Sequence, residues 1–399
     1  SGPCFAPSRN VTDDQTRLFQ LGLLDSSMFN RLVKTVYPEG VLGSIRPNDL
    51  AVLPIVDDEK AAIANTVEQL VKCSKEDWHS VETSVAFGSH PIMLEHLKAS
   101  STLIADDFLT IESDTHEFVN YITSLEQSLN EHIDESYEID ASERVVVSAS
   151  DLSFYKNPYF TIGTNLDESE PDAYKAKVLN TFRSDTVVSL ISYIVGCIMG
   201  RFSYTGDGVV FANQNGSQFK SLLNEDAYSG FQPDDDAIVP LAEDSWVYED
   251  DATGRVVEFV KSVWGAESLN QNINFIAESL ILNAINPKKA EPAENTIRRY
   301  LSSQFFKDHV TKYARKPIYW LFSSGKEKAF ECLVYMHRYN EGTLSRMRTE
   351  YLIPLIGAYE AQYNLLSEQQ LQATGTEART IEKDLKSLGG KQAELRSFD

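Results

Sequence analysis

One apolar run, Val187–Gly200 (VVSLISYIVGCIMG), constrains the fold more than any other stretch of the chain. A helix that crosses a bilayer needs about 20 apolar residues, and this run is shorter and is interrupted by Ser, Tyr and Gly. It therefore predicts a helix buried in the core of a domain. Gly196 and Gly200 stand four residues apart within it, so a neighbouring segment could approach that face closely.

Charge is distributed unevenly along the chain. The 399 residues include 36 Lys+Arg and 59 Asp+Glu, a net charge of −23. Residues 101–300 carry 13 basic and 34 acidic side chains, whereas residues 307–348 carry nine basic and four acidic ones. Binding to phosphate backbones comes from clustered Lys and Arg, so the acidic total argues against nucleic acid only for the middle of the chain.

Helical periodicity dominates the pattern, which predicts a predominantly helical α+β, multi-domain protein with small mixed-strand segments. Phe118, Ile122, Leu125, Leu129 and Ile133 form one helical stripe, and Val145–Val147 reads as a short strand. Two further stripes beyond residue 343 predict a C-terminal antiparallel helical hairpin. Composition divides the chain into residues 1–58, a helical spacer at 59–140, an acidic and mainly helical domain at 141–290, and a basic helical domain at 291–399 that ends in the hairpin.

Motifs that carry chemistry are missing from the sequence. There is no GxxxxGK[ST], GxGxxG, GxSxG or HExxH, so we expect no catalytic, cofactor-binding or metal-ligating residue in this chain. Asn157-Pro158-Tyr159-Phe160 resembles the Asn-Pro-Pro-Tyr/Phe motif of amino-methyltransferases, but it lacks the second proline and no glycine-rich cofactor loop precedes it. We interpret it as a loop. The dispersed cysteines are typical of a reducing compartment, so we expect a cytoplasmic location and no membrane partner.

Five stretches resemble a known family, in the same order along the chain. They are KCSKEDWHSVETSVAFGSHPIM at 72–93, elements between Ile191 and Ser203, FKDH at 306–309, RKPIYWLFSSG at 315–325 and YMHRYN at 335–340. They are similar to the PglX (BrxX) proteins, the adenine-specific DNA methyltransferases of BREX phage-defence systems. Ile45–Leu53, followed by a helix from Glu59, also resembles the end of a target-recognition domain of type I restriction specificity subunits.

The family resemblance implies that this chain is the C-terminal region of a longer enzyme. A methyltransferase domain N-terminal to Ser1 would bind S-adenosylmethionine and methylate adenine N6, and this chain would be inactive alone. The implied partners are double-stranded DNA, that methyltransferase domain and other BREX proteins.

Basic and aromatic residues interleave in the most recognisable stretch. Basic side chains hold phosphate groups while aromatic side chains such as Tyr319, Trp320 and Phe322 support the surface, a combination typical of DNA binding. Charge reversal at Arg346 and Arg348 is then expected to weaken DNA binding and flatten its salt dependence. The candidate DNA-binding residues are Arg315, Lys316, Lys326, Lys328, Arg338, Arg346 and Arg348.

Other interpretations stay open. The aromatic residues could anchor a core, and the basic strip could neutralise the acidic middle or dock on another domain. The sequence favours a DNA-recognition and assembly role. The alternatives are a non-catalytic protein–protein interaction module that docks other defence components, and an acidic mimic of DNA.

Overall fold

The computed structural model describes residues 13–36, 53–56, 58–163, 171–212, 216–242, 248 and 251–399. Its contacts divide the chain into two compact units, unit 1 (residues 1–81 and 112–178) and unit 2 (residues 82–111 and 179–399). Two long helices, α6 and α8, supply residues to both units. Half of the expected segment 1–58 lies outside the described residues, and so do residues 45–52 of the stretch Ile45–Leu53 that resembles the end of a target-recognition domain.

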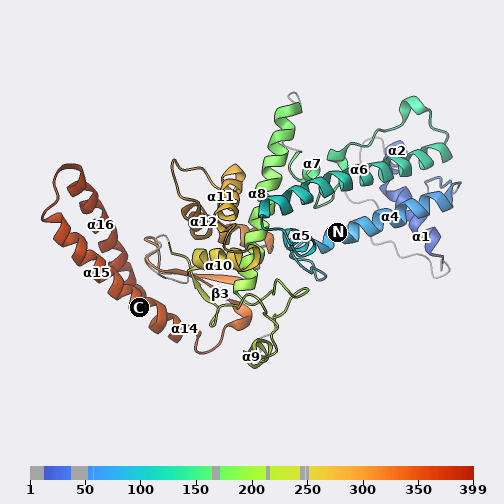
Figure 1. The fold of residues 1–399 in the computed structure, drawn as a ribbon. Coiled ribbons are helices and arrows are strands. Elements are labelled where there is room, and N and C mark those ends of the chain that lie inside the picture. Colours follow the sequence, from blue (N-terminus) through green and yellow to red (C-terminus); the bar gives the residue numbers. More distant parts are fainter. Residues whose placement is uncertain are drawn as a thin grey trace. The chain divides into compact units, whose positions relative to one another are not determined.

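Unit 1 is built from helices around one apolar core. The stripe expected at 118–133 is confirmed on α6, where Ile122, Leu129 and Ile133 are fully buried. Gly22 lets α1 approach α4 closely, because a Cβ there would lie 2.6 Å from Val67 Cγ2. The elements, drawn in Figure 1, are α1 (Asp14–Asp25), α2 (Ser27–Val36), α4 (Lys60–His79), α6 (Ile104–Ser136), η1 (Ala141–Glu143), η2 (Ala149–Asp151) and α7 (Pro158–Thr161).

The expected strand at Val145–Val147 is wrong. These residues have irregular backbone and pair with no strand among the described residues, and the Val146 side chain is 83% exposed. A β-strand is stabilised by hydrogen bonds to a neighbouring strand, and β-branched residues alone do not supply one. Val145 and Val147 instead line a pocket against the helices.

The core of unit 2 forms around α8 (Pro171–Ile198), which confirms the buried helix expected at 187–200. Val187, Leu190, Ile191 and Ile194 are completely buried. Among the described residues, α8 is the helix long and apolar enough to cross a membrane, yet 67% of its apolar window is buried inside the protein. That burial is typical of a core helix.

Further helices of unit 2 surround this core and contribute to it (Figure 1). They are α5 (Pro91–Ala99), α9 (Gly216–Asn224), α10 (Ala252–Trp264), α11 (Leu269–Asn283), α12 (Ala293–Tyr300), the π-helical η4 (Leu301–Phe305) and α13 (Phe306–Lys312).

A three-stranded antiparallel sheet completes the core of unit 2. Its strand order is β1 (Ile238–Pro240), β3 (Glu331–Tyr335) and β2 (Tyr319–Ser323), with Ile238 and Trp320 both opposite Val334. Every residue of the central strand β3 is buried. The expected predominantly helical α+β class is therefore confirmed, with strands that are antiparallel.

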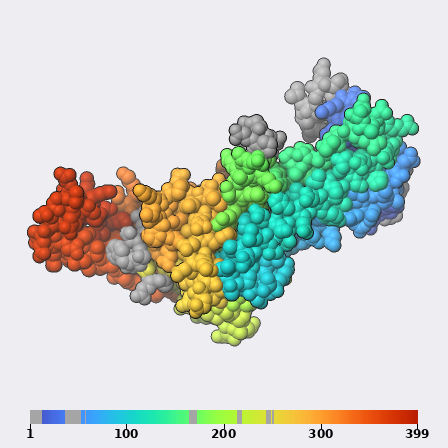
Figure 2. Space-filling view, turned by 45° about the horizontal axis from the view of Figure 1, so that its top comes forward, coloured from blue at the N-terminus to red at the C-terminus, as the bar shows by residue number. Residues whose placement is uncertain are grey.

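The last part of unit 2 packs two helices against each other. Gln392 Nε2 of α16 (Gly375–Phe398) donates to Tyr359 O of α15 (Ile353–Gln370) at 3.1 Å, and Gly389 faces Tyr363. Along α15 the contacts advance while along α16 they recede, so the two helices are antiparallel, as the red ribbons of Figure 1 show. Figure 2 shows the same two helices as the red part of the surface. η5 (Met336–Arg338), α14 (Thr343–Arg346) and the π-helical η6 (Met347–Leu352) precede them.

Candidate nucleic-acid interface

Three of the candidate basic residues lie in the turns at the two ends of β2. Arg315 and Lys316 belong to the turn between α13 and β2, where the amide of Arg315 donates to Val310 O at 2.8 Å. Lys326 belongs to the turn between β2 and β3. All three side chains are exposed, and none forms an ion pair with any residue that the structure describes. They are the candidates whose charge is available to a ligand.

Another three candidates are paired with carboxylates. Lys328 Nζ lies 3.1 Å from Glu331, and Arg346 Nε lies 3.7 Å from Glu350. Arg348 makes a two-pronged contact with Asp399, at 2.6 and 3.0 Å. A phosphate group would therefore have to compete with these carboxylates.

Arg338 has a structural role. It is 9% exposed, and its guanidinium donates to the carbonyl oxygens of Met199, Asp234 and Asp235 at 3.3, 2.7 and 2.7 Å. The same group stacks 3.7 Å from the centre of the Phe219 ring. The structure thus uses Arg338 to anchor the acidic run at 234–236 against α8.

The aromatic residues of the same stretch divide between core and surface. Tyr319 is completely buried, whereas Trp320 is 50% exposed. This alternation follows from β2, in which successive side chains point to opposite faces of the sheet. The core interpretation therefore holds for Tyr319, and Trp320 remains at the surface.

Glu82 is the centre of a buried polar cluster that the sequence did not reveal. Its carboxylate accepts hydrogen bonds from Ser192 Oγ at 2.7 Å, Lys312 Nζ at 2.8 Å and Tyr313 OH at 2.8 Å. Burial alone raises the pKa of Glu82, but the Lys312 ammonium and these hydrogen bonds hold it below its ordinary value. The acid is therefore a structural anion that joins three distant segments.

His309 connects α13 to the beginning of β2. Its Nε2 accepts hydrogen bonds from the amides of Ile318 and Tyr319, at 3.1 and 3.2 Å, and its ring stacks between Phe305 and Tyr319. Burial lowers the pKa of His309 to about 4. A neutral ring with its proton on Nδ1 fits this arrangement, because a protonated ring has no acceptor for the two amides.

The tetrapeptide at 157–160 does not form an amine-binding site. The side chain of Asn157 is completely buried; its Oδ1 accepts from Tyr159 N at 3.1 Å and its Nδ2 donates to the carbonyls of Ala149 and Leu152. Its amide is thus fully used as the N-cap of α7. In this arrangement Asn157 Oδ1 already accepts a hydrogen bond from within the chain, so it is not free to accept one from a target amine.

The five stretches that resemble PglX belong to unit 2, apart from residues 72–81, which belong to unit 1. Glu82 from 72–93 contacts Ser192 from 191–203, and His309 from 306–309 contacts Tyr319 from 315–325. The ring of Tyr319 in turn packs edge-on against Tyr335, with centroids 5.5 Å apart. The recognisable sequence is therefore a set of mutually packed core segments.

Comparison with known proteins agrees with this resemblance. No family model matches the chain. Over 353 residues, 88% of this chain, it is 42% identical to the adenine-specific methyltransferase BrxX of Escherichia coli O9:H4 (strain HS). The chain is homologous to a part of BrxX. It is also 28% identical to the adenine-specific methyltransferase PglX of Lacticaseibacillus casei (strain Zhang). This match extends over 391 residues, 95% of the chain.

The homology covers a minor part of each relative. The matched region is 28% of BrxX and 29% of PglX, so the chain spans less than a third of the length of either protein. The homology therefore relates unit 1 and unit 2 to one region of adenine-specific methyltransferases.

Proposed function

We propose that this chain is the DNA-recognition and assembly portion, from the C-terminal region, of a BREX-type adenine-N6 DNA methyltransferase in phage defence. The observation that carries the proposal is the 42% identity to BrxX over 88% of the chain. In this proposal another region of the parent binds S-adenosylmethionine and transfers the methyl group. The proposed partners are double-stranded DNA, that methyltransferase domain and other BREX proteins, in the cytoplasm.

The exposed turns around β2 support the DNA-binding part of this proposal. Arg315 and Lys316 lie before the strand and Lys326 follows it, with no carboxylate of the described residues paired to them. Five residues of strand span roughly 17 Å at about 3.4 Å per residue. That length is about half of the ~34 Å turn of a DNA duplex, so the two turns are spaced to hold separate phosphate groups.

The remaining candidates have secondary places in the proposal. To bind DNA, each of the paired residues must exchange its carboxylate for a phosphate, so each contributes less binding free energy than an unpaired cation. They are Lys328, Arg346 and Arg348. Arg338 is held by backbone carbonyls and contributes only to folding.

The test is DNA binding by the full chain, measured as fluorescence anisotropy on a labelled duplex across a salt series. Charge reversal of all three exposed residues (Arg315→Glu, Lys316→Glu, Lys326→Glu) should reduce the slope of log affinity against log salt by about 0.9 for each lost phosphate contact. Arg346→Glu with Arg348→Glu should cause a smaller reduction. The matched control reverses three exposed lysines of unit 2 elsewhere (Lys261→Glu, Lys288→Glu, Lys289→Glu).

An unchanged slope in the first triple variant would remove the DNA-binding role. The acidic stretch 101–300 favours the second candidate, a protein–protein interaction module that docks other defence components through its charge. A pull-down with the other BREX proteins, repeated at high salt, distinguishes that function because screening weakens contacts between exposed charges.

A further inference from the structure

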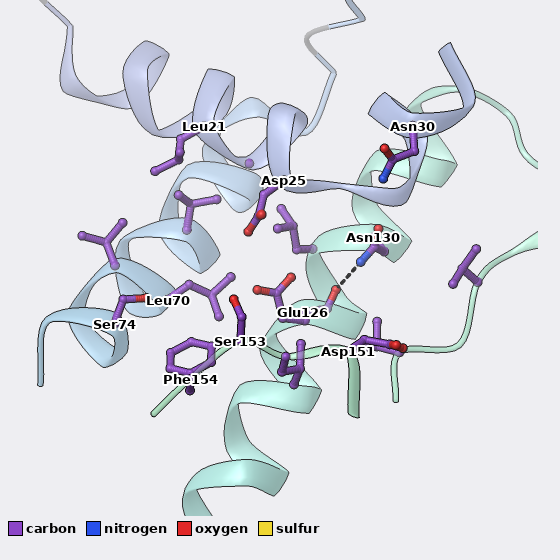
Figure 3. A pocket seen from close by; sticks show the side chains of 17 residues that line it. Leu21, Asp25, Asn30, Leu70, Ser74, Glu126, Asn130, Asp151, Ser153 and Phe154 are labelled. Atoms are coloured by element: carbon purple, nitrogen blue, oxygen red, sulfur yellow. Dashed lines mark hydrogen bonds between the residues drawn. The ribbon is translucent and has the colours of Figure 1, made fainter. Parts of the chain in front are cut away.

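Unit 1 contains an open pocket of about 520 Å³ lined by α1, α2, α4, α6 and the stretch 145–154 (Figure 3). Its volume lies in the range of small-molecule sites. Apolar side chains that include Val67, Leu70, Leu129 and Phe154 line one part of the wall, and polar side chains that include Asn30, Ser74 and Asn130 line the rest. The pocket is thus a preformed hollow whose wall suits a ligand with both a polar and an apolar end.

Two carboxylates face each other in this pocket. Figure 3 shows the side chains of Asp25, at the mouth, and Glu126, on α6, directed into the pocket and toward one another. Neither carboxylate has a hydrogen bond or ion pair to any described residue. The nearby amide of Asn130 is already used, since it donates to the backbone oxygen of Glu126 at 2.8 Å and accepts from Ser27 N at 2.7 Å.

Neither acid has a compensating cation among the described residues; Asp25 is exposed and Glu126 is half-buried. Asp25 is the last residue of α1, where the helix dipole disfavours negative charge, and no basic residue stands in that last turn. Desolvation and the charge of Asp25 together raise the pKa of Glu126 to about 7. A cation placed between the carboxylates would offset the repulsion between their charges.

We propose that this pocket binds the ammonium group of a primary aliphatic amine between Asp25 and Glu126. The alkyl stem of the amine then packs against the apolar part of the wall, chiefly Leu70 and Phe154. A metal ion suits the site less well. Hard cations take six or more oxygen ligands, and among the described residues no group of three or more His, Cys, Asp or Glu is arranged to hold one.

The proposal is tested with n-pentylamine and its neutral counterpart 1-pentanol, using calorimetry on the full chain at pH 8. This pH lies above the pKa of Glu126, which is about 7, so that carboxylate is mostly ionised and pentylamine should bind at least tenfold more tightly than pentanol. Glu126→Gln should remove this preference and leave weak binding of both compounds. The control variant Glu117→Gln, an exposed acid on the same helix, should keep the preference. Equal binding of the two compounds to the unaltered chain would overturn the proposal, as would an unchanged preference in Glu126→Gln.

Two further measurements show whether the variant is folded and identify the source of the amine. Glu126→Gln should raise the melting temperature at pH 8, because it removes an uncompensated charge, so failed folding is distinguishable from lost binding. An acetylated and amidated Gly-Lys-Gly tripeptide presents the same ammonium group as a protein side chain. Tighter binding of the tripeptide than of pentylamine assigns a lysine of a partner protein, and the reverse order assigns a free amine. Both orders support the site.

Discussion

The ammonium of Lys312 lies 2.8 Å from a carboxylate oxygen of Glu82, a residue 230 positions earlier in the chain. Glu82 is buried, and its other hydrogen bonds come from neutral hydroxyl groups. Lys312 is therefore the only cation paired with this buried charge among the described residues.

Lys312→Met keeps the alkyl stem and removes the charge, leaving Glu82 buried without its cation. Breaking a buried pair in this way costs about 3 kcal/mol, a value that partial exposure of Lys312 reduces toward 2. Urea denaturation measures the loss. Lys307→Met on the same helix is the exposed control and should change stability by less than about 0.5 kcal/mol. Addition of Glu82→Gln to Lys312→Met should recover part of the loss, and a further fall in stability would contradict the pairing.

His309 should make unit 2 sensitive to mild acid. Burial lowers its folded-state pKa to about 4, below the ordinary 6.5, so the unfolded chain binds the proton more readily. Stability is then fully present above pH 6.5 and falls as the pH drops toward 4, by about 1.4 kcal/mol per pH unit at the steepest point. His309→Gln keeps an acceptor for the two amides without a titrating group, so its unfolding free energy should depend less on pH.

The comparison must be made between variants, because other groups titrate in the same range. Burial also lowers the pKa of His90, to about 3. It raises the pKa of Asp185 to about 6, and the stability that Asp185 contributes therefore changes with pH in the opposite direction. Urea unfolding at pH 5, 6 and 7 isolates the contribution of His309 as a difference from the unaltered chain. Identical pH slopes in the two proteins would show that His309 is not held neutral by its two amide donors.

Arg338→Lys should destabilise the chain by about 2 kcal/mol and leave DNA affinity unchanged. A lysine cannot donate to three carbonyls with a planar fork, nor stack on Phe219 in the same way. Arg348→Lys is the matched control, since its exposed pair with Asp399 is worth less than about 1 kcal/mol. Thermal unfolding and DNA anisotropy on the same samples separate the two roles. If the Arg338→Lys protein is folded but binds DNA more weakly, Arg338 takes part in DNA binding and its role is not only structural.

Gly196→Ala tests the close approach on α8. An added Cβ would lie 2.4 Å from Phe202 Cδ2, so the ring must move within a packed core, at a cost of about 1–3 kcal/mol. Gly357→Ala in α15 has open space around the new Cβ and should be neutral or stabilising by up to ~1 kcal/mol. Differential scanning calorimetry distinguishes the two. A neutral Gly196→Ala would mean that Phe202 packs loosely.

Patterns local in the sequence were predictable, and pairings between distant segments were not. The stripe on α6 and the apolar run on α8 follow from helical spacing, because one face of each helix is buried. The central strand β3 pairs with β1, which lies nearly a hundred residues earlier in the chain, and no local sequence pattern predicts this pairing. Val145–Val147 shows the converse, since strand-forming residues without a neighbouring strand stay irregular.

Charge and composition are properties of consecutive residues, whereas the folded units bring together residues that are far apart in the sequence. The boundaries expected at 58, 140 and 290 follow composition, while the contacts assemble each unit from two separate stretches. At the candidate site the sequence placed Arg315, Lys316 and Lys326 among other basic residues, but nothing distinguished Arg338 from them. Its burial depends on Phe219 and on the backbone carbonyls at 234 and 235, which the sequence does not connect to it.

The distance along the chain between Glu82 and Lys312 also has a consequence in time. A ribosome adds roughly 5–20 residues per second, so the lysine emerges roughly 10 to 50 seconds after the acid that it neutralises. Until then the core of unit 2 has neither its internal counter-ion nor the strands β2 and β3. A nascent chain interrupted before about residue 335 would expose this half-built core, and such a fragment is a natural substrate for chaperones and proteases.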